Sequence, residues 1–221
     1  ENLKFTDETI NNVKNFKFEG INIGEHANSG TIRYFSTTDF RKYKNSKEIV
    51  SKYIKAALVT QNVCENLFKN RKYDEIFINH GIYVPQGVIL DSAKKFGINS
   101  STWCFAYTRN SVNITRGDTY HKALIYEEKN KWNNFLFYKK IEKKIDDFLL
   151  LRRRGKSVTM SNNWELAIKD QNLDVENYLI KRKIDINKPI IGLATNMLWD
   201  AQVFFPSNFF KDILEWLFFT I

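Results

Sequence analysis

The sequence has few cysteines and no long apolar run. Cys64 and Cys104 are its only cysteines, and neither belongs to a paired motif, so the simplest interpretation is a reduced, cytoplasmic setting. No run approaches the ~18 apolar residues of a membrane span. The chain starts at Glu1 without an apolar signal segment and stops abruptly. Both ends predict a fragment, so the missing targeting signal carries little weight.

Several motifs of nucleotide and metal chemistry are also absent. The sequence contains no phosphate-loop pattern, no Gly-x-Gly-x-x-Gly and no paired Cys or His at metal-ligand spacing. It also lacks Asp-x-Asp, the pair with which many metal-dependent sugar transferases hold a divalent ion on a diphosphate. A mechanism centred on a metal ion is therefore disfavoured, and no cofactor is expected.

The composition is that of a folded, basic protein. Hydrophobic residues make up 43% and aromatic residues 15% of the chain, which is ample for a packed core. The formal net charge of +9 favours an anionic partner such as a phosphate-rich ligand, nucleic acid or acidic lipid surface. Charge alone does not choose among these partners.

The central part of the chain alternates strands and helices. The clearest helix has one apolar face and a lysine-rich polar face, and a strand, a helix ending at Gly97 and a second strand follow it. Strand, helix and strand with short connections indicate a parallel sheet covered by helices, so we expect an α/β fold. These elements are predicted at 46–70, 73–79, 88–96 and 99–107.

Less regular patterns flank this region. Residues 16–23 alternate like a strand and lead into a small-residue loop at Gly24–Gly30, before a helical turn that carries Arg33. Residues 108–120 are expected to be irregular. A long basic helix is predicted over 127–156 and one or two further helices over 161–181.

The C-terminal stretch predicts a second domain. Residues 190–194 have the length and apolarity of a buried strand, 195–200 form a polar loop, and 209–221 repeat apolar residues at helical spacing. Strand, loop and helix make the first half of a nucleotide-binding βαβ unit. We therefore expect a Rossmann-like domain over 1–185 and the truncated start of a second over 186–221.

Three predicted loops follow strands, where an open α/β sheet binds ligands. His80 is the leading candidate for a general base, because histidine accepts a proton near neutral pH. Asn79, Gly81 and Gln86 beside it are candidate ligand-binding residues. The alternative is a turn histidine that caps a backbone group.

Other candidates have equally plain alternatives. Glu25 and His26 are further candidate bases. Arg109 and Arg116 could hold a phosphate or an acidic sugar, or be solvated loop residues. The basic run 139–156 fits an ordinary amphipathic helix better than contact with an anionic membrane. No recognition motif supports nucleic-acid binding. His121 is expected to begin a helix.

The block Thr195–Gln202 (TNMLWDAQ) resembles the capsule polysaccharide biosynthesis proteins of bacterial surface-glycan assembly. Asn79-His80-Gly81 and residues 24–33 support the resemblance more loosely. It implies a GT-B-like glycosyltransferase with two Rossmann-like halves, an acceptor glycan or glycolipid on the first and a nucleotide sugar on the second. Thr195 and Asn196 would then receive the diphosphate on backbone amides, and Asp200 would bind a sugar hydroxyl or cap a helix.

The predicted function is therefore metal-independent transfer of a sugar from a nucleotide donor to a capsular or other surface polysaccharide. We expect a cytoplasmic protein, with peripheral contact at the inner membrane as one option, and no nucleic-acid partner. This chain alone should lack full activity. The alternatives are a non-catalytic protein of polysaccharide assembly or export, and an enzyme similar to a sugar-nucleotide epimerase.

Overall fold

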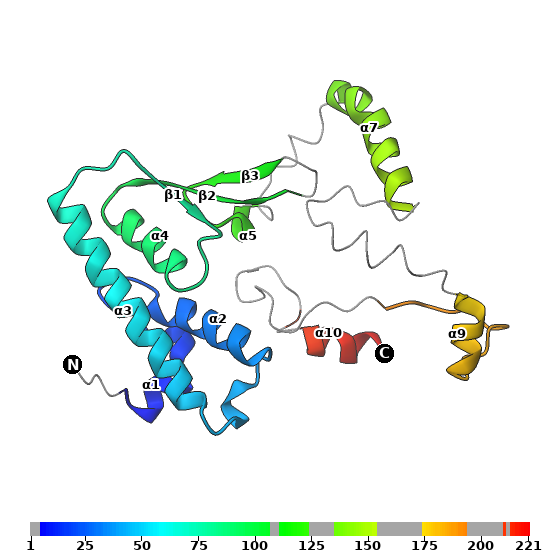
Figure 1. The fold of residues 1–221 in the computed structure, drawn as a ribbon, viewed down its shortest axis with the longest axis horizontal. Coiled ribbons are helices and arrows are strands. Elements are labelled where there is room, and N and C mark those ends of the chain that lie inside the picture. The colour runs from blue at the N-terminus through cyan, green and yellow to red at the C-terminus, as the bar shows by residue number, and fades with distance from the viewer. Residues whose placement is uncertain (1–4, 107–110, 124–134, 154–173, 194–209, 211–212) are drawn as a thin grey trace. The chain divides into compact units, whose positions relative to one another are not determined.

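The computed structural model describes residues 5–106, 111–123, 135–153, 174–193, 210 and 213–221 (Figure 1). They form a mixed α/β structure with a three-stranded sheet. Proximity of residues in space divides the chain into two compact units, one of Glu1–Cys104, Asn113–Glu127 and Asn196–Ile221 and one of Phe105–Val112 and Glu128–Thr195. The domain division near residue 185 stays a prediction.

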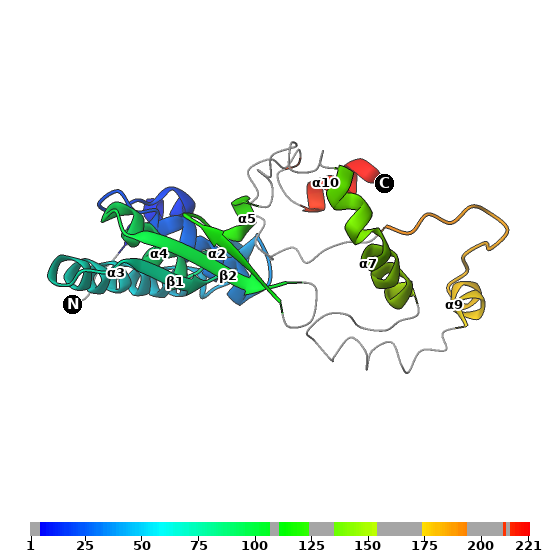
Figure 2. The same cartoon turned by 90° about the horizontal axis from the view of Figure 1, so that it is seen from above.

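The sheet contains the predicted parallel pair and one strand that was not expected. β1 (Glu75–Asn79) pairs in parallel with β2 (Asn99–Phe105), with Glu75 opposite Asn99. α4 (Gln86–Lys95) connects them and packs against β1 (Figure 2). The predicted strand, helix and strand are confirmed. Gly97 follows the helix with φ +67°, the left-handed conformation expected beyond a helix end.

β3 (Val112–Arg116) is the third strand, in a segment predicted to be irregular. The Ala106 amide donates to the Ser111 carbonyl at 3.1 Å, and the Gly117 amide donates to the Ser100 carbonyl at 2.7 Å. Residue numbers rise along β2 from Ser100 to Ala106 while those of the bonded partners fall from Gly117 to Ser111. β3 is therefore antiparallel to β2. The prediction missed it because only two apolar residues, Val112 and Ile114, alternate along so short a strand.

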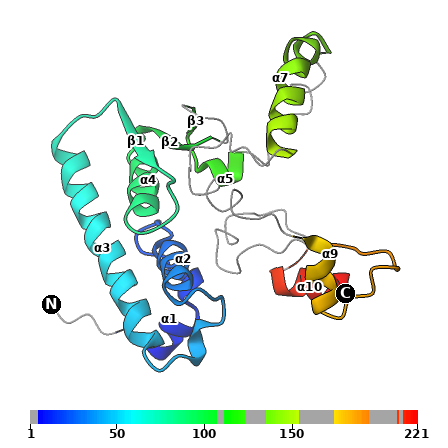
Figure 3. The ribbon, with the colours of Figure 1, turned by 45° about the vertical axis from the view of Figure 1, so that its right-hand side comes forward.

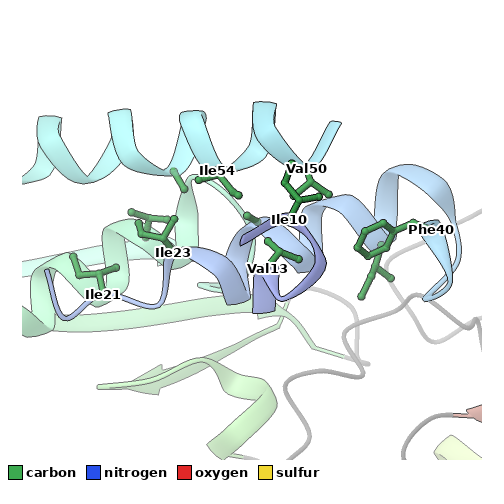
Figure 4. Close-up of a cluster of buried hydrophobic side chains, with 11 residues drawn as sticks. Ile10, Val13, Ile21, Ile23, Phe40, Val50 and Ile54 are labelled. Carbon is green, nitrogen blue, oxygen red and sulfur yellow. The ribbon is translucent and has the colours of Figure 1, made fainter. Parts of the chain in front are cut away.

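α3 (Ser46–Asn70) has the predicted bounds and supports the main core. It packs against α1 (Asp7–Asn11), α2 (Ile23–Phe35) and α4 (Figure 3). Short 3-10 turns, η1 (Val13–Asn15) and η2 (Phe40–Lys42), close the same bundle. The apolar cluster between these elements is drawn in Figure 4; it includes Ile10, Val13, Ile21, Ile23, Phe40, Val50 and Ile54.

α2 corrects the prediction of a strand and a loop at its position. Phe18 and Ile21 form only an isolated antiparallel bridge, and residues 24–30 are helical. Their small side chains permit close packing instead of a turn. A Cβ on Gly24 would lie 1.7 Å from the Val13 carbonyl oxygen, and one on Gly30 would lie 2.5 Å from the Tyr53 ring. The hydroxyls are satisfied within the helix, since Ser29 and Thr31 donate to carbonyls four residues earlier.

Two faces of the sheet differ in exposure. Ser100, Thr102 and Cys104 are buried on the face toward α4. The opposite face carries Phe77, 58% exposed, stacked on Trp103 with ring centroids 6.4 Å apart. Phe105, Val112 and Ile114 are also exposed, so one face presents a row of apolar side chains to solvent.

The C-terminal half of the chain contributes further helices, each within a segment predicted to be helical. α7 (Phe135–Arg153) lies within the predicted basic helix, α9 (Val175–Lys181) within the predicted helical region, and α10 (Ile213–Thr220) within the predicted C-terminal helix. The strand predicted at 190–194 is wrong for its described part: residues 190–193 have no regular structure, and Ile191 is 90% exposed. Among the described residues, 190–193 have neither the backbone hydrogen bonds nor the burial that would hold a strand. Among the helices that the structure describes, none has the length and apolarity to cross a membrane.

Candidate functional site

The carboxyl end of β1 presents His80 in a strained turn. His80 has φ +58° and Gly81 has φ +73°, so two successive residues are left-handed. The His80 amide donates to the Trp103 carbonyl at 3.0 Å, and Asn79 Nδ2 donates to the same oxygen at 3.1 Å. The turn is therefore held to β2 at the sheet edge where α/β proteins bind ligands. A left-handed non-glycine residue costs about 1 kcal/mol or more and often marks a functional position.

His80 lies beside two aromatic residues of α5 (Tyr120–Ala123). Its ring centroid is 5.5 Å from that of Tyr120 and 6.4 Å from that of His121, to which it is nearly parallel. His121 is the second residue of this short helix, close to the expected helix start, and is buried. Burial, and the charge of His80 as a smaller cause, lower the pKa of His121 to about 4. His121 is therefore neutral near pH 7.

His26 is placed in the core and not in a loop. Its Nδ1 lies 2.8 Å from the Ile82 carbonyl oxygen, which can only accept, so Nδ1 carries a proton. Its Nε2 lies 3.1 Å from Asp91 Oδ2. Both ring nitrogens are engaged, and Gly87 leaves the space that the ring fills. His26 therefore joins α2 to α4 and to the loop after His80.

α2 also carries two other residues of interest, Arg33 and Glu25. Arg33 has its guanidinium carbon 4.9 Å from the centroid of the Tyr83 ring, which brings a cation to the loop after His80. Glu25 is half-buried in the first turn of α2, and its carbonyl oxygen accepts from Ser29. Its carboxylate stays a weaker candidate for a base.

Gly81 and Gln86 have different surroundings. A Cβ on Gly81 would lie 2.8 Å from both Leu90 Cδ2 and Thr102 Cγ2, so packing alone requires glycine there. Gln86 is half-buried at the first position of α4, after Pro85. Gln86 stays a candidate ligand-binding residue.

Arg116 lies at the wrong end of the sheet to serve His80. It is the last residue of antiparallel β3, so it stands at the amino ends of β1 and β2. Arg116 was predicted in a loop that follows a strand, but it is the last residue of β3 itself. Because β3 is antiparallel to β2, this end of β3 lies at the edge opposite His80. Arg109, Thr195, Asn196 and Asp200 lie outside the described residues.

The sequence alone missed the neighbours of the two histidines. Tyr120 and His121 are about forty positions from His80 in the chain, and the return of the segment after β3 brings them together. In that segment Thr102 Oγ1 donates to the Asp118 carbonyl at 2.8 Å, which fixes its path beside β2. Asp91 had only helical spacing to identify it. Neither pairing leaves a local sequence signal.

Within the described ranges, no three His, Cys, Asp or Glu side chains gather in a group that could hold a metal ion. Comparison of the chain with protein-family models, with curated proteins and with solved structures finds no match. The class of protein that the structure defines is therefore a mixed α/β protein with a histidine cluster at the carboxyl end of its first strand. The resemblance to capsule polysaccharide biosynthesis proteins stays a prediction.

Proposed function

We propose that the His80 cluster is the acceptor side of a glycosyltransferase that moves a sugar from a nucleotide-activated donor to a surface polysaccharide. One observation carries the proposal: a histidine in a left-handed turn ends the first strand of a parallel pair, beside Tyr120 and a neutral His121. Ligands meet α/β sheets at this edge. A Rossmann-like fold, with a second nucleotide-binding domain begun near residue 186, is part of the same proposal.

In the proposed step, His80 takes the proton of an acceptor hydroxyl. That oxygen forms a bond to the anomeric carbon of the donor sugar, and the bond from this carbon to the nucleotide diphosphate breaks, with the electron pair leaving on the diphosphate oxygen. Histidine suits the task because its ordinary pKa lies near the working pH. A neutral His121 adds no positive charge that would oppose protonation of His80.

The surroundings of His80 offer hydrogen bonds to a polyhydroxyl ligand. The ring of Tyr120, which carries a hydroxyl, has its centroid 5.5 Å from that of His80, and Gln86 begins α4 six residues after His80. Arg33 over Tyr83 places a guanidinium at the same loop. Amide, phenol and guanidinium groups are those that fix the orientation of sugars and of anionic substituents.

The test is sugar transfer by the whole protein with His80→Asn, because asparagine tolerates the left-handed backbone. Loss of general-base catalysis should lower kcat by about 100-fold or more while leaving the affinity for the nucleotide sugar close to that of the parent. Lys52→Gln, a surface change on α3, serves as the control. Near-normal turnover in folded His80→Asn would remove His80 as the base.

Two other outcomes would replace the proposal. Calorimetry that detects no affinity for any nucleotide sugar would favour a non-catalytic role in polysaccharide assembly or export. Turnover of the nucleotide sugar without an acceptor would favour an epimerase-like reaction.

A further inference from the structure

A cavity lies at the opposite edge of the sheet from His80. Its volume is about 480 Å³, and it opens at the amino ends of β1 and β2, where Glu75, Asn99 and Ser100 line it. Glu75 and Asn79 are the first and last of the five residues of β1, so their Cα atoms lie about 13 Å apart at the usual rise per residue of a strand. The cavity is therefore distinct from the His80 cluster.

Two cations line this cavity. Lys94, in the last turn of α4, has its Nζ 3.3 Å from Asp118 Oδ1. Arg116 ends β3, so a strand fixes its backbone. Across the part of the chain that the structure describes, the Arg116 guanidinium has neither an ion pair nor a hydrogen bond, although five N–H donors are available. An arginine whose backbone is held by a strand, lining a cavity together with a lysine, is suited to a carboxylate or phosphate.

A carboxylate stands across the cavity from Arg116. Glu75 Oε1 accepts a hydrogen bond from Ser101 Oγ at 2.5 Å. The bond between Gly117 and Ser100 sets the register of β2 and β3, and it places Ser101 directly opposite Arg116. Ser101 therefore lies between the two charged residues: Arg116 is opposite it on β3, and Glu75, which is opposite Asn99 in the register of β1 and β2, reaches it diagonally. No ion pair joins the Glu75 and Arg116 side chains in the described structure.

We propose that this cavity binds a small polar ligand that carries a carboxylate or phosphate and, a few ångströms away, a hydroxyl or ammonium donor. Arg116 and Lys94 hold the anionic group. Glu75 Oε2 accepts from the donor, because Ser101 already occupies Oε1. The volume is within the range of small-molecule sites, and the charged lining selects a hydrophilic ligand. The proposal is independent of the function proposed for His80.

The experiment measures binding of four probes to the purified protein by calorimetry and by chemical-shift changes. Glycerol phosphate and glucuronate carry the anionic group and hydroxyls, inorganic phosphate carries the anion alone, and glucose carries hydroxyls alone. We expect one of the first two to bind at about millimolar Kd or tighter, more strongly than inorganic phosphate and glucose. The stronger of the two identifies the anionic group.

Matched variants assign the binding to this cavity. Arg116→Gln should weaken the better probe by about tenfold or more, and Arg116→Lys by less, because lysine keeps the charge without the paired donors. Glu75→Gln should weaken the same probe but leave inorganic phosphate unchanged. Lys52→Gln makes the same charge change as Arg116→Gln at an exposed site on α3 and should have no effect.

Three results would overturn the proposal: no binding of either hydroxylated anion up to about 10 mM, equal binding of glucose, or equal loss of affinity in Lys52→Gln and Arg116→Gln. Circular dichroism confirms that each variant is folded, and Arg116 is exposed, so its replacement leaves the core intact. Sugar transfer by the His80 site can fail without affecting these results, since the two sites occupy opposite ends of β1.

Discussion

His26 Nε2 lies 3.1 Å from Asp91 Oδ2, and its Nδ1 lies 2.8 Å from the Ile82 carbonyl oxygen. One buried ring therefore connects α2, α4 and the loop that follows His80. Because the carbonyl only accepts, the ring must donate through Nδ1, and Nε2 is the ring atom that faces Asp91. The arrangement makes His26 a structural residue on which the position of the His80 turn depends.

Replacement of His26 should destabilise the protein. His26→Ala leaves Asp91 and a buried carbonyl without the ring and opens a space beside Gly87. We expect a loss of about 2–4 kcal/mol in the free energy of unfolding, measured as a lower urea midpoint. Lys42→Ala, which breaks the exposed ion pair with Asp39, should change it by less than about 1 kcal/mol. Equal effects of the two changes would contradict the structural role.

The pKa of His121 predicts a loss of stability in mild acid. Its folded pKa is about 4, below the ordinary histidine value of 6.5, because burial and then the nearby His80 disfavour the charged form. The unfolded chain then binds the proton more tightly, so stability is present above the unfolded value and is lost as the pH falls toward the folded one. Between about pH 7 and pH 5 this linkage amounts to about 2 kcal/mol.

His121→Asn should remove that part of the pH dependence. The measurement is the urea midpoint of parent and variant at the two pH values. The variant is expected to be less stable near pH 7 but to lose less on acidification. Parallel curves for the two proteins would show that His121 does not titrate in this way.

The left-handed turn at His80 sets which side chains that position accepts. His80→Asn should leave the thermal midpoint nearly unchanged, because asparagine adopts positive φ more readily than other non-glycine residues. His80→Val should cost about 1–2 kcal/mol, because a β-branched residue is strained there. A valine variant as stable as the asparagine variant would mean that the turn changes its conformation.

Substitution of Gly81 and of Gly97 distinguishes the energetic cost of backbone strain from the cost of crowding. Both have positive φ, but a Cβ would meet Leu90 and Thr102 at Gly81 and nothing within 4 Å at Gly97. Gly97→Ala should cost about 1 kcal/mol, whereas Gly81→Ala should cost about 2–4 kcal/mol because it also forces core side chains to move. The difference, measured by chemical denaturation, reports the packing of the His80 turn against α4 and β2.

Polar substitutions on the exposed sheet face should reduce its apolar surface without affecting folding. Phe77 is 58% and Ile114 57% exposed, so Phe77→Thr and Ile114→Thr remove little buried area. Each should change unfolding free energy by less than about 1 kcal/mol and reduce binding of a hydrophobic dye. A large loss of stability would mean that these side chains are covered in solution.

The sequence by itself determined the elements whose signal is local. α3 has its predicted bounds because a long amphipathic repeat specifies both its length and its buried face. The unit of β1, α4 and β2 was predicted for the same reason, with Gly97 marking the helix end. His80 was found as a loop histidine after a strand, since apolar runs and turn residues define such positions within a few residues.

Tertiary structure decided the features that depend on contacts between distant segments. Gly24 and Gly30 indicate a loop by composition, yet they lie in α2 because neighbouring backbone and the Tyr53 ring leave no room for a Cβ. The antiparallel direction of β3 places Arg116 at the edge opposite His80, and the return of the segment after β3 brings His121 beside His80. Small residues and short strands have the same sequence pattern in several folds, and only packing and hydrogen-bond register distinguish them.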